Sequence, residues 1–266
     1  MFAKGLISIV VVILFVSGLA FAMDPPAKHP KTGEDLIVTA LKGTPRAIDG
    51  SLNDWQLSFM KPAVLDTKEQ IYSGVAPGAA SWDGPKDLSG NFYLMWDDKN
   101  VYIAVVVKDD KLVMNQANGD IWNADCIEIF FSQPEIAAQT GTEHYQYGFN
   151  ANNDRWNWCN MEGAGQKEPD YLQIASSKTA DGYICEAAIE YKNMKSLEFK
   201  AGNTLGFHAV LDDNDDSAIR EIQMTWTSNE AHNQSLGFGY LILSAENAAV
   251  DSEDKAVLTW GAIKNQ

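Results

Sequence analysis

The feature that most constrains the fold is a series of short segments in which apolar and polar residues alternate. Most are rich in β-branched and aromatic residues and are bounded by Gly, Asn, Asp or Pro, which is typical of β-strands. No window long enough for a helix keeps a clean period of 3.6, so long helices are not expected. The candidate strands are residues 36–41, 91–96, 101–107, 126–131, 145–150, 171–176, 182–190, 205–211, 221–226, 239–243 and 256–260.

This pattern favours an all-β fold, namely a single antiparallel β-sandwich of the immunoglobulin-like or jelly-roll kind with long loops. Residues 62–89 form a long connection that is either a draped loop or an insertion with an edge strand. Residues 133–140 are expected to form a short helix, and residues 245–255 an acidic connector to the last strand. Since there is no internal repeat and no low-complexity linker, we expect residues 23–266 to form one domain.

Residues 1–22 have the composition of a secretory signal peptide. Lys4 supplies a positive charge, residues 6–14 are almost entirely apolar, and Ala20-Phe21-Ala22 is a small-x-small cleavage site. This apolar stretch is too short for a membrane span, and no later segment approaches the necessary length. We therefore expect cleavage after Ala22 and a secreted or periplasmic mature chain without a membrane span.

Charge limits the partners that the chain can have. The full chain has 20 Lys and Arg against 36 Asp and Glu, with a formal net charge of −16. Removal of residues 1–22 takes Lys4 away and leaves −17. Such a surface repels nucleic acid and anionic membranes. It also offers oxygen ligands to calcium, although most of the acidic residues are expected only to keep the protein soluble.

The cysteines Cys126, Cys159 and Cys185 are odd in number, and their spacing matches no metal-binding pattern. In an oxidising compartment they are expected to form either one disulfide with one buried thiol or three buried thiols. No histidine lies in a recognisable partner motif, so a catalytic cysteine is not expected.

The stretch GDIWNADCIEIFF, residues 119–131, contains the main candidate site. Strand alternation places its isoleucines and Phe131 on the core face and Glu128 on the opposite face. Trp122 has the same parity as Glu128, but it would lie about 20 Å away along an extended strand. A bend at residues 123–124 would bring the indole ring closer to the carboxylate and form a platform for a polar ligand.

An aromatic ring beside a carboxylate suits sugar recognition. The C–H face of a pyranose stacks on an aromatic ring. Its hydroxyl groups are bound by carboxylate, amide and guanidinium side chains. Several tryptophans lie beside such side chains in the sequence, and these are Trp122, Trp156, Trp158 and Trp226. Core packing is the alternative for each of them, and a structural role is what we expect for Trp55 and Trp96.

Motifs along most of the mature chain resemble those of the family 9 carbohydrate-binding modules, within the DOMON-like β-sandwich domains. The series starts with IDGSLNDW, residues 48–55, and continues with FYLMWDDKNVYIAVVVKDDKL, residues 92–112. It includes IWNADCIEIFF, residues 121–131, and closes with LGFGYLIL, residues 236–243. The resemblance implies a non-catalytic module that binds a poly- or oligosaccharide, such as xylan or glucan chain ends. It would support carbohydrate catabolism by separate glycoside hydrolases.

The resemblance also implies roles for single residues. A terminal sugar would lie between two tryptophans, of which Trp226 is the positional match for the second. The implied substrate-binding residues are Trp122, Glu128, Asn150, Arg155, Gln223 and Trp226. Calcium ions would be structural, and the candidate ligands are Asp109, Asp110, Asp212, Asp213 and Asp215. A solvated turn is the alternative interpretation of residues 212–216.

Three other functions remain open on the sequence. Some DOMON-like relatives bind haem b and transfer electrons, with Met and His or Lys as axial ligands. The candidate ligands here are Met95, Met114, His144 and His208, but no pair stands out. A glycoside hydrolase is also conceivable, because carboxylates are abundant, although their separation across a cleft cannot be read from the sequence. A purely structural role in the cell envelope is the third alternative.

Overall fold

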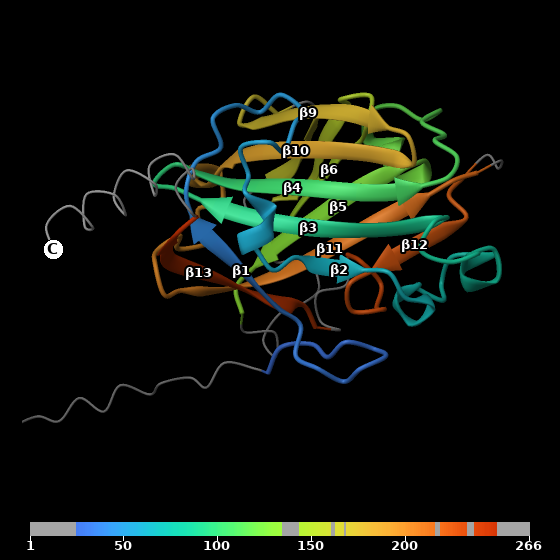
Figure 1. Ribbon diagram of the computed structural model, residues 1–266, viewed down its shortest axis with the longest axis horizontal. Helices are drawn as coiled ribbons and strands as arrows, with labels where there is room; N and C mark the ends of the chain where they lie inside the picture. Colours follow the sequence, from blue (N-terminus) through green and yellow to red (C-terminus); the bar gives the residue numbers. More distant parts are fainter. Residues whose placement is uncertain are drawn as a thin grey trace, which may run out of the picture.

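The structure is a computed structural model with two packed layers of β-strands (Figure 1). It describes residues 25–134, 144–160, 163–167, 169–215, 219–232 and 237–248, with the backbone alone given for residues 159–160 and 163–167. The expected signal peptide, the expected strand at 256–260 and most of the expected helix at 133–140 lie outside these residues. In the described part of the chain, no helix is long and apolar enough to cross a membrane.

Thirteen strands in the described residues join into one hydrogen-bonded sheet. They are β1 (Ile37–Lys42), β2 (Ala63–Leu65), β3 (Leu88–Trp96), β4 (Asn100–Asp109), β5 (Cys126–Ser132), β6 (His144–Phe149), β7 (Arg155–Asn160), β8 (Gly163–Lys167), β9 (Leu172–Thr179), β10 (Gly182–Glu190), β11 (Thr204–Asp213), β12 (Ile222–Thr225) and β13 (Gly239–Asn247). Short 3₁₀ turns connect them: η1 (Leu57–Phe59), η2 (Lys68–Gln70), η3 (Gly78–Ala80), η4 (Asn118–Asn123) and η5 (Tyr191–Asn193).

The sheet folds back on itself into a sandwich, which confirms the predicted all-β fold. The front layer in Figure 1 has the order β3-β4-β10-β9, with β2 beside β3. The rear layer has the order β8-β7-β6-β5-β11, with β12 beside β11. β13 and β1 join the layers, and β1 pairs in parallel with both β13 and β3. These parallel pairs are the one departure from the expected antiparallel sandwich.

The core between the layers follows the alternation predicted from the sequence. On β5, Ile127, Ile129 and Phe131 are fully buried and belong to the main hydrophobic cluster. Trp96 is part of the same cluster and donates its Nε1–H to the carbonyl of Ser244 at 2.9 Å. Each such apolar side chain contributes roughly 1.5–3 kcal/mol by leaving water.

The IDGSLNDW segment covers one end of the outer face of the front layer, where a buried carboxylate anchors it. Glu186 of β10 accepts hydrogen bonds at Oε2 from the backbone N–H groups of Asp49, Gly50 and Ser51 at 2.9, 2.6 and 3.1 Å. Its Oε1 accepts a hydrogen bond from Trp55 Nε1 at 2.6 Å. Trp55 is fully buried beside Met95 and Tyr102 on this outer face, as expected for a tryptophan with a structural role.

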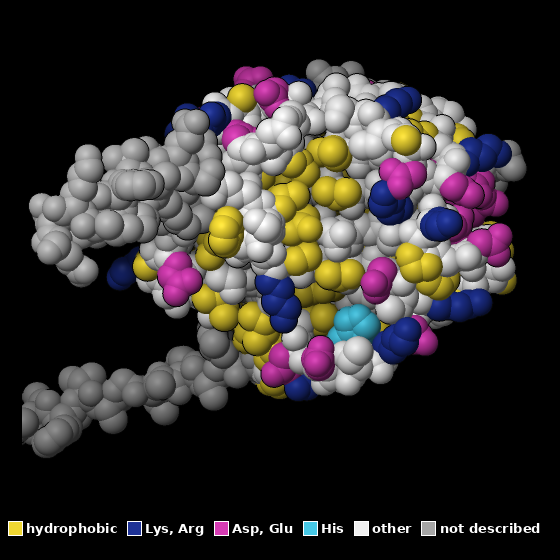
Figure 2. Space-filling model, viewed as in Figure 1, with side chains coloured by type: hydrophobic (Ala, Val, Ile, Leu, Met, Phe, Trp, Pro, Cys, Tyr) yellow, Lys and Arg dark blue, Asp and Glu magenta, His cyan; other side chains and the backbone are white. Residues whose placement is uncertain are grey.

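The same outer face also carries an apolar stripe, which is visible in Figure 2. Tyr93, Val106 and Ile184 lie on this face of β3, β4 and β10 and are only half-buried. The stripe belongs to the front layer, whereas Glu128 lies on β5 in the rear layer.

The cysteines of β5 and β10 do not pair. Cys126 and Cys185 are buried free thiols, which excludes a disulfide between them. Burial raises the pKa of the Cys126 thiol well above its usual range, so it is expected to be unreactive. The side chain of Cys159 is outside the described atoms.

Candidate functional site

A pocket of about 310 Å³ opens on the outer face of the rear layer. On β5 and β6, the outward-facing positions Glu128, His144 and Gln146 alternate with buried core residues such as Tyr145. The complete lining is Trp122, Glu128, His144, Gln146, Trp158, Arg220, Gln223, Ala231 and His232. The pocket therefore joins two tryptophans with carboxyl, amide and guanidinium groups.

Trp122 reaches the pocket because the chain bends before β5. η4 ends at Asn123, and Ala124 returns to an extended conformation. The chain therefore bends at residues 123–124, which is the condition under which the sequence brings Trp122 close to Glu128. The guanidinium carbon of Arg220 lies 4.6 Å from the centroid of the Trp122 ring, within the range of a cation–π contact. The indole is thereby held in one orientation.

Glu128 lies at the bottom of the pocket, where its residue is only 2% exposed. Gln146 Nε2 donates a hydrogen bond to Glu128 Oε2 at 2.6 Å. Burial and the neighbouring carboxylate of Asp212 raise the pKa of Glu128 well above its usual range, while Arg220 opposes this shift. The carboxyl group therefore faces the pocket as the sequence indicated, but it is far more buried than a surface platform would require.

Asp212, one of the predicted calcium ligands, contacts two of the residues that line this pocket. Arg220 Nη1 donates to Asp212 Oδ1 at 2.6 Å, and Gln223 Nε2 donates to the same oxygen at 3.1 Å. The physical reason is alternation along β11, because Asp212 is paired with Cys126 and faces outward with Glu128. Burial raises the pKa of Asp212, and the contact with Arg220 opposes that shift.

Trp158 lies across β6 on the same outer face. Its Nε1–H donates to the carbonyl of Gly119 at 2.7 Å. A Cβ atom at Gly148 would meet the Trp158 ring at 2.2 Å, so only glycine allows the ring to lie against the strand. The pocket lining thus includes a second fixed indole from the middle of the chain.

The structure brings only some of the predicted binding residues to the pocket. Trp122, Glu128 and Gln223 line it. Trp226 is 3% exposed and packs its ring edge-on against Phe207, with ring centroids 5.7 Å apart. Its parity is that of Ile222 and Met224, which also face the core, so its place in the core follows from alternation.

Asn150 and Arg155 are not among the lining residues either. Asn150 is buried in a turn, where its Oδ1 accepts the backbone N–H groups of Asn152 and Asp154 at 3.0 and 3.1 Å. Arg155 begins β7 and is half-buried. Asn150 thus lies in the turn between β6 and β7, and Arg155 is the first residue of the strand that carries Trp158.

Gln146, Trp158 and Arg220 line the pocket but were not among the implied binding residues, although Trp158 was one of the candidate tryptophans. Gln146 could have been found by applying alternation to the strand after Glu128. Trp158 could have been found by the same approach in residues 155–160, which were not expected to form a strand. Nothing in the sequence indicated Arg220, because its place depends on the path of the turn between β11 and β12.

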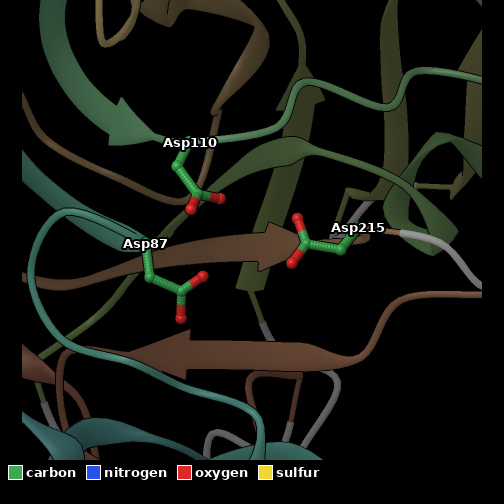
Figure 3. A group of neighbouring side chains, drawn as sticks. All are labelled: Asp87, Asp110 and Asp215. Atoms are coloured by element: carbon green, nitrogen blue, oxygen red, sulfur yellow. The ribbon is translucent and has the colours of Figure 1, made fainter.

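A cluster of aspartates lies at one end of the sandwich, and part of it is drawn in Figure 3. One group is Asp87, Asp110 and Asp215, and the other is Asp109, Asp125 and Asp213. Within each group, one carboxylate oxygen per residue lies within 4.8 Å of the others. Four of the five predicted calcium ligands are therefore brought together, while Asp87 and Asp125 carried no signal in the sequence.

The inner group of aspartates has the character of a site for a hard cation. Asp109 and Asp213 are 3% and 2% exposed, and each has a buried oxygen without a hydrogen-bond partner. Burial and the repulsion between neighbouring carboxylates raise the pKa of Asp109 to about 7, that of Asp125 to about 8 and that of Asp213 to about 9. Buried carboxylates are costly unless they are paired or coordinate a metal, and calcium prefers oxygen ligands.

A larger cavity of about 720 Å³ lies beside β2, β3 and β4. Its lining includes Lys86, Lys108 and Asp181 but no aromatic side chain. It therefore lacks the flat apolar surface on which a sugar ring stacks. The smaller pocket at Trp122 has the more suitable chemistry despite its lower volume.

Of the candidate haem ligands, His144 and His208 lie together against Phe130, with ring centroids 5.4 and 5.8 Å from it, but Met95 lies in the other layer. Met95 packs with Trp55 in a cluster on the outer face of the front layer. His208 is stacked on Phe238 in the rear layer, with ring centroids 5.0 Å apart. This arrangement does not favour the pairing of Met and His that the haem hypothesis requires.

Comparison with known proteins identifies the family. The profile described as carbohydrate family 9 binding domain-like matches residues 64–246. The chain belongs to this family. The family is one of binding domains, so the chain is a carbohydrate-binding module and not a catalytic domain.

Two solved structures of family 9 modules from Caldicellulosiruptor kristjanssonii share the fold. The complex with cellotriose has a TM-score of 0.56 at 22% identity and covers 81% of this chain and 98% of that chain. The complex with glucose has a TM-score of 0.57 at 22% identity and covers 81% of this chain and 99% of that chain.

Two proteins that are similar to this chain in sequence are much longer than it is. Endo-1,4-beta-xylanase A of Thermotoga neapolitana is 27% identical over 219 residues, which are 78% of this chain and 18% of the xylanase. Exoglucanase XynX of Acetivibrio thermocellus is 26% identical over 218 residues, which are 80% of this chain and 18% of the exoglucanase. The chain thus spans less than a fifth of the length of these relatives.

Proposed function

We propose that this protein binds xylan or glucan chains at the pocket that contains Trp122 and Glu128. The observation that carries the proposal is the joining of two indole rings, those of Trp122 and Trp158, with Glu128, Gln146 and Arg220 in one small hollow. A compact pocket, in contrast to an extended groove, favours the end of a chain over an internal stretch.

Each part of the pocket matches a part of a sugar. The indoles offer apolar faces to the C–H groups of a pyranose ring. Gln146 and Gln223 present amide groups, and Glu128 presents a carboxyl group, to the sugar hydroxyls. Because Gln146 and Arg220 already contact Glu128, the polar side chains are held in place before a sugar arrives.

The relatives and structural neighbours support this ligand class. The neighbours were solved with cellotriose and with glucose, and the relatives are a xylanase and an exoglucanase. Together with the signal-peptide pattern of residues 1–22, they support a secreted or periplasmic module that works beside glycoside hydrolases. We propose one domain, residues 23–266, for the mature chain.

We also propose that the aspartate cluster holds structural calcium. Asp109, Asp125 and Asp213 would bind one ion, and the outer group of Asp87, Asp110 and Asp215 would complete the site. The ion would supply the positive charge that buried carboxylates otherwise lack. The three side chains come from β4, from the start of β5 and from β11, so the ion would join both layers of the sandwich.

Isothermal titration calorimetry with cello- and xylo-oligosaccharides tests the sugar site. We expect Trp122→Ala to weaken binding at least about tenfold, since aromatic anchors at the centre of a site contribute 2 kcal/mol or more. The matched control is Trp226→Phe, which alters a core indole and is expected to lower the melting temperature without changing the affinity. Unchanged affinity in Trp122→Ala, or lost affinity in folded Trp226→Phe, would show that the site is misplaced.

A further inference from the structure

The aspartate cluster and the sugar pocket lie back to back on the same strand ends. On β11, Asp212 contacts the pocket residue Arg220, and the next residue, Asp213, belongs to the cluster. In the segment from η4 to β5, Trp122 and Glu128 line the pocket, whereas Asp125 belongs to the cluster. The two sites therefore share backbone, and a movement of either strand end reaches both of them.

Asp125 holds three segments together at this point. It is fully buried, and its Oδ1 accepts the backbone N–H of Asn214 at 3.0 Å. Its Oδ2 accepts the backbone N–H of Val113, and its own N–H donates to the Val113 carbonyl at 3.1 Å. The side chain thus links the segment after β4, the segment that carries Trp122, and the turn after β11.

The turn after β11 is tied to the same cluster at both ends. Asn214 Nδ2 donates to the carbonyl of Asn123, next to Trp122, at 3.4 Å. The N–H of Glu221, next to Arg220, donates to the carbonyl of Asp213 at 2.7 Å, and Glu221 Oε2 accepts the N–H of Asp215 at 3.1 Å. The backbone on either side of the stacked pair of Trp122 and Arg220 is therefore fixed by residues of the cluster.

We infer that Asp125 is a positioning residue for the sugar pocket and that a divalent cation in the inner aspartate group strengthens sugar binding. This inference rests on the proposed function. Without a cation, Asp109, Asp125 and Asp213 can ionise only against repulsion between carboxylate oxygens that lie within 4.8 Å of one another. That repulsion acts on the two segments that carry Trp122 and Arg220.

A bound cation reverses this repulsion and draws the two segments together. The sugar then binds to a pocket that is already ordered, so less conformational entropy is lost on binding. Because such coupling is reciprocal, the sugar must increase cation affinity by the same factor. We expect a factor of about 5 or more, the lower end of typical coupling between sites.

The first test titrates cellotriose and xylotriose into the purified protein, in calcium chloride and in a chelator, and measures the dissociation constants. The reciprocal titration measures calcium affinity with and without the sugar. We expect both affinities to rise by the same factor. A calcium-induced rise in melting temperature with an unchanged sugar affinity would overturn the inference and leave the sugar site standing. If neither sugar binds in calcium, the proposed function itself fails, and this inference with it.

The second test compares Asp125→Asn with Asp181→Asn at saturating calcium. Asp181 lies on the surface in an ion pair with Lys108, outside both aspartate groups, and each variant loses one carboxylate. We expect only Asp125→Asn to weaken sugar binding, by about fivefold or more, because only Asp125 bonds to the segments around the pocket. Equal sugar affinities of the two folded variants would overturn the positioning role. If Asp125→Asn does not fold, the wild-type titrations with and without calcium decide whether the cation strengthens sugar binding.

Discussion

At the scale of single residues, Arg220 connects the parts of the pocket. It lies over the Trp122 ring, pairs with Asp212 at 2.6 Å and lies 3.8 Å from Glu128. Two buried carboxyl groups thus depend on one guanidinium. Removal of one partner from a buried ion pair is strongly destabilising, because an uncompensated charge stays behind.

We predict that Arg220→Gln lowers the free energy of unfolding by about 3 kcal/mol and weakens sugar binding more than tenfold. The loss has two causes, since Asp212 loses its cation and Trp122 loses the group that fixes its ring. Urea unfolding and calorimetry measure the two effects. A suitable control is Lys42→Gln, which removes an exposed pair with Asp98. It should change stability by no more than about 1 kcal/mol.

The sequence predicted the faces of single residues better than their partners. Alternation placed Glu128 on the outer face, whereas Trp122 reaches the same pocket from η4, to which strand alternation does not apply. The same alternation, applied to Trp226, would have placed it in the core with Met224. Arg220 was out of reach, because the direction of a side chain in a turn depends on backbone contacts far away in the sequence.

At the scale of elements, the IDGSLNDW segment is fixed by a carboxylate and not by strand pairing. Glu186 accepts four hydrogen bonds from this segment, all between 2.6 and 3.1 Å. A carboxylate is a stronger acceptor than an amide, and a side-chain amide would also place a donor against backbone N–H groups. The motif is thus a structural anchor of the front layer, remote from the pocket in the rear layer.

We therefore predict that Glu186→Gln lowers the free energy of unfolding by about 1–3 kcal/mol, the cost of leaving buried donors unsatisfied. The sugar affinity of the folded protein should not change. Glu190→Gln on the same strand is the control, since its pairs with Lys99 and Lys192 are largely exposed and are worth at most about 1 kcal/mol. Equal stability losses in the two variants would argue against the anchor.

Element boundaries show what a sequence pattern can miss. Strands β4, β5 and β10 were predicted within a few residues, because each is rich in β-branched or aromatic residues. β7 and β8 were not predicted, since RWNWCN and GAGQK contain no β-branched residue. The parallel pairing of β1 with β13 and β3 was also missed, because pairing between distant strands leaves no local signal.

At the scale of the whole molecule, a part of the negative charge is concentrated in one place. Among 36 acidic residues, Asp87, Asp109, Asp110, Asp125, Asp213 and Asp215 gather at one end of the sandwich. Asp213 and Asp215 of the motif DDNDD, residues 212–216, lie in this group, whereas Asp212 contacts Arg220. The motif alone could not separate Asp212 from Asp213, because one residue along a strand turns the side chain to the other face.

We predict that, in a chelator, the melting temperature falls as pH rises from about 5 to about 9. The pKa of Asp109, Asp125 and Asp213 is raised to about 7, 8 and 9 in the fold, against about 3.9 in an unfolded chain. The folded state therefore binds more protons, and its stability is lost as these carboxyl groups ionise. Calcium should raise the melting temperature most at the high end of this range, because it favours the ionised carboxylates.

Calorimetric melting curves at several pH values, with and without calcium, check this prediction. Asp213→Asn should flatten the dependence on pH in the chelator and reduce the stabilisation by calcium. Asp181→Asn serves as the control, since Asp181 lies on the surface in an ion pair with Lys108. A melting temperature that rises with pH in the chelator would contradict the burial of the three acids.

The central claim is that sugar binds between the indoles on the outer face of the rear layer. Nuclear magnetic resonance of the tryptophan side chains, during a titration with cello- or xylo-oligosaccharides, tests it most directly. We predict that the indole N–H signals of Trp122 and Trp158 shift with the added sugar while those of Trp55, Trp96 and Trp226 stay in place. Shifts confined to these three buried indoles, or none with any of the sugars, would contradict the account.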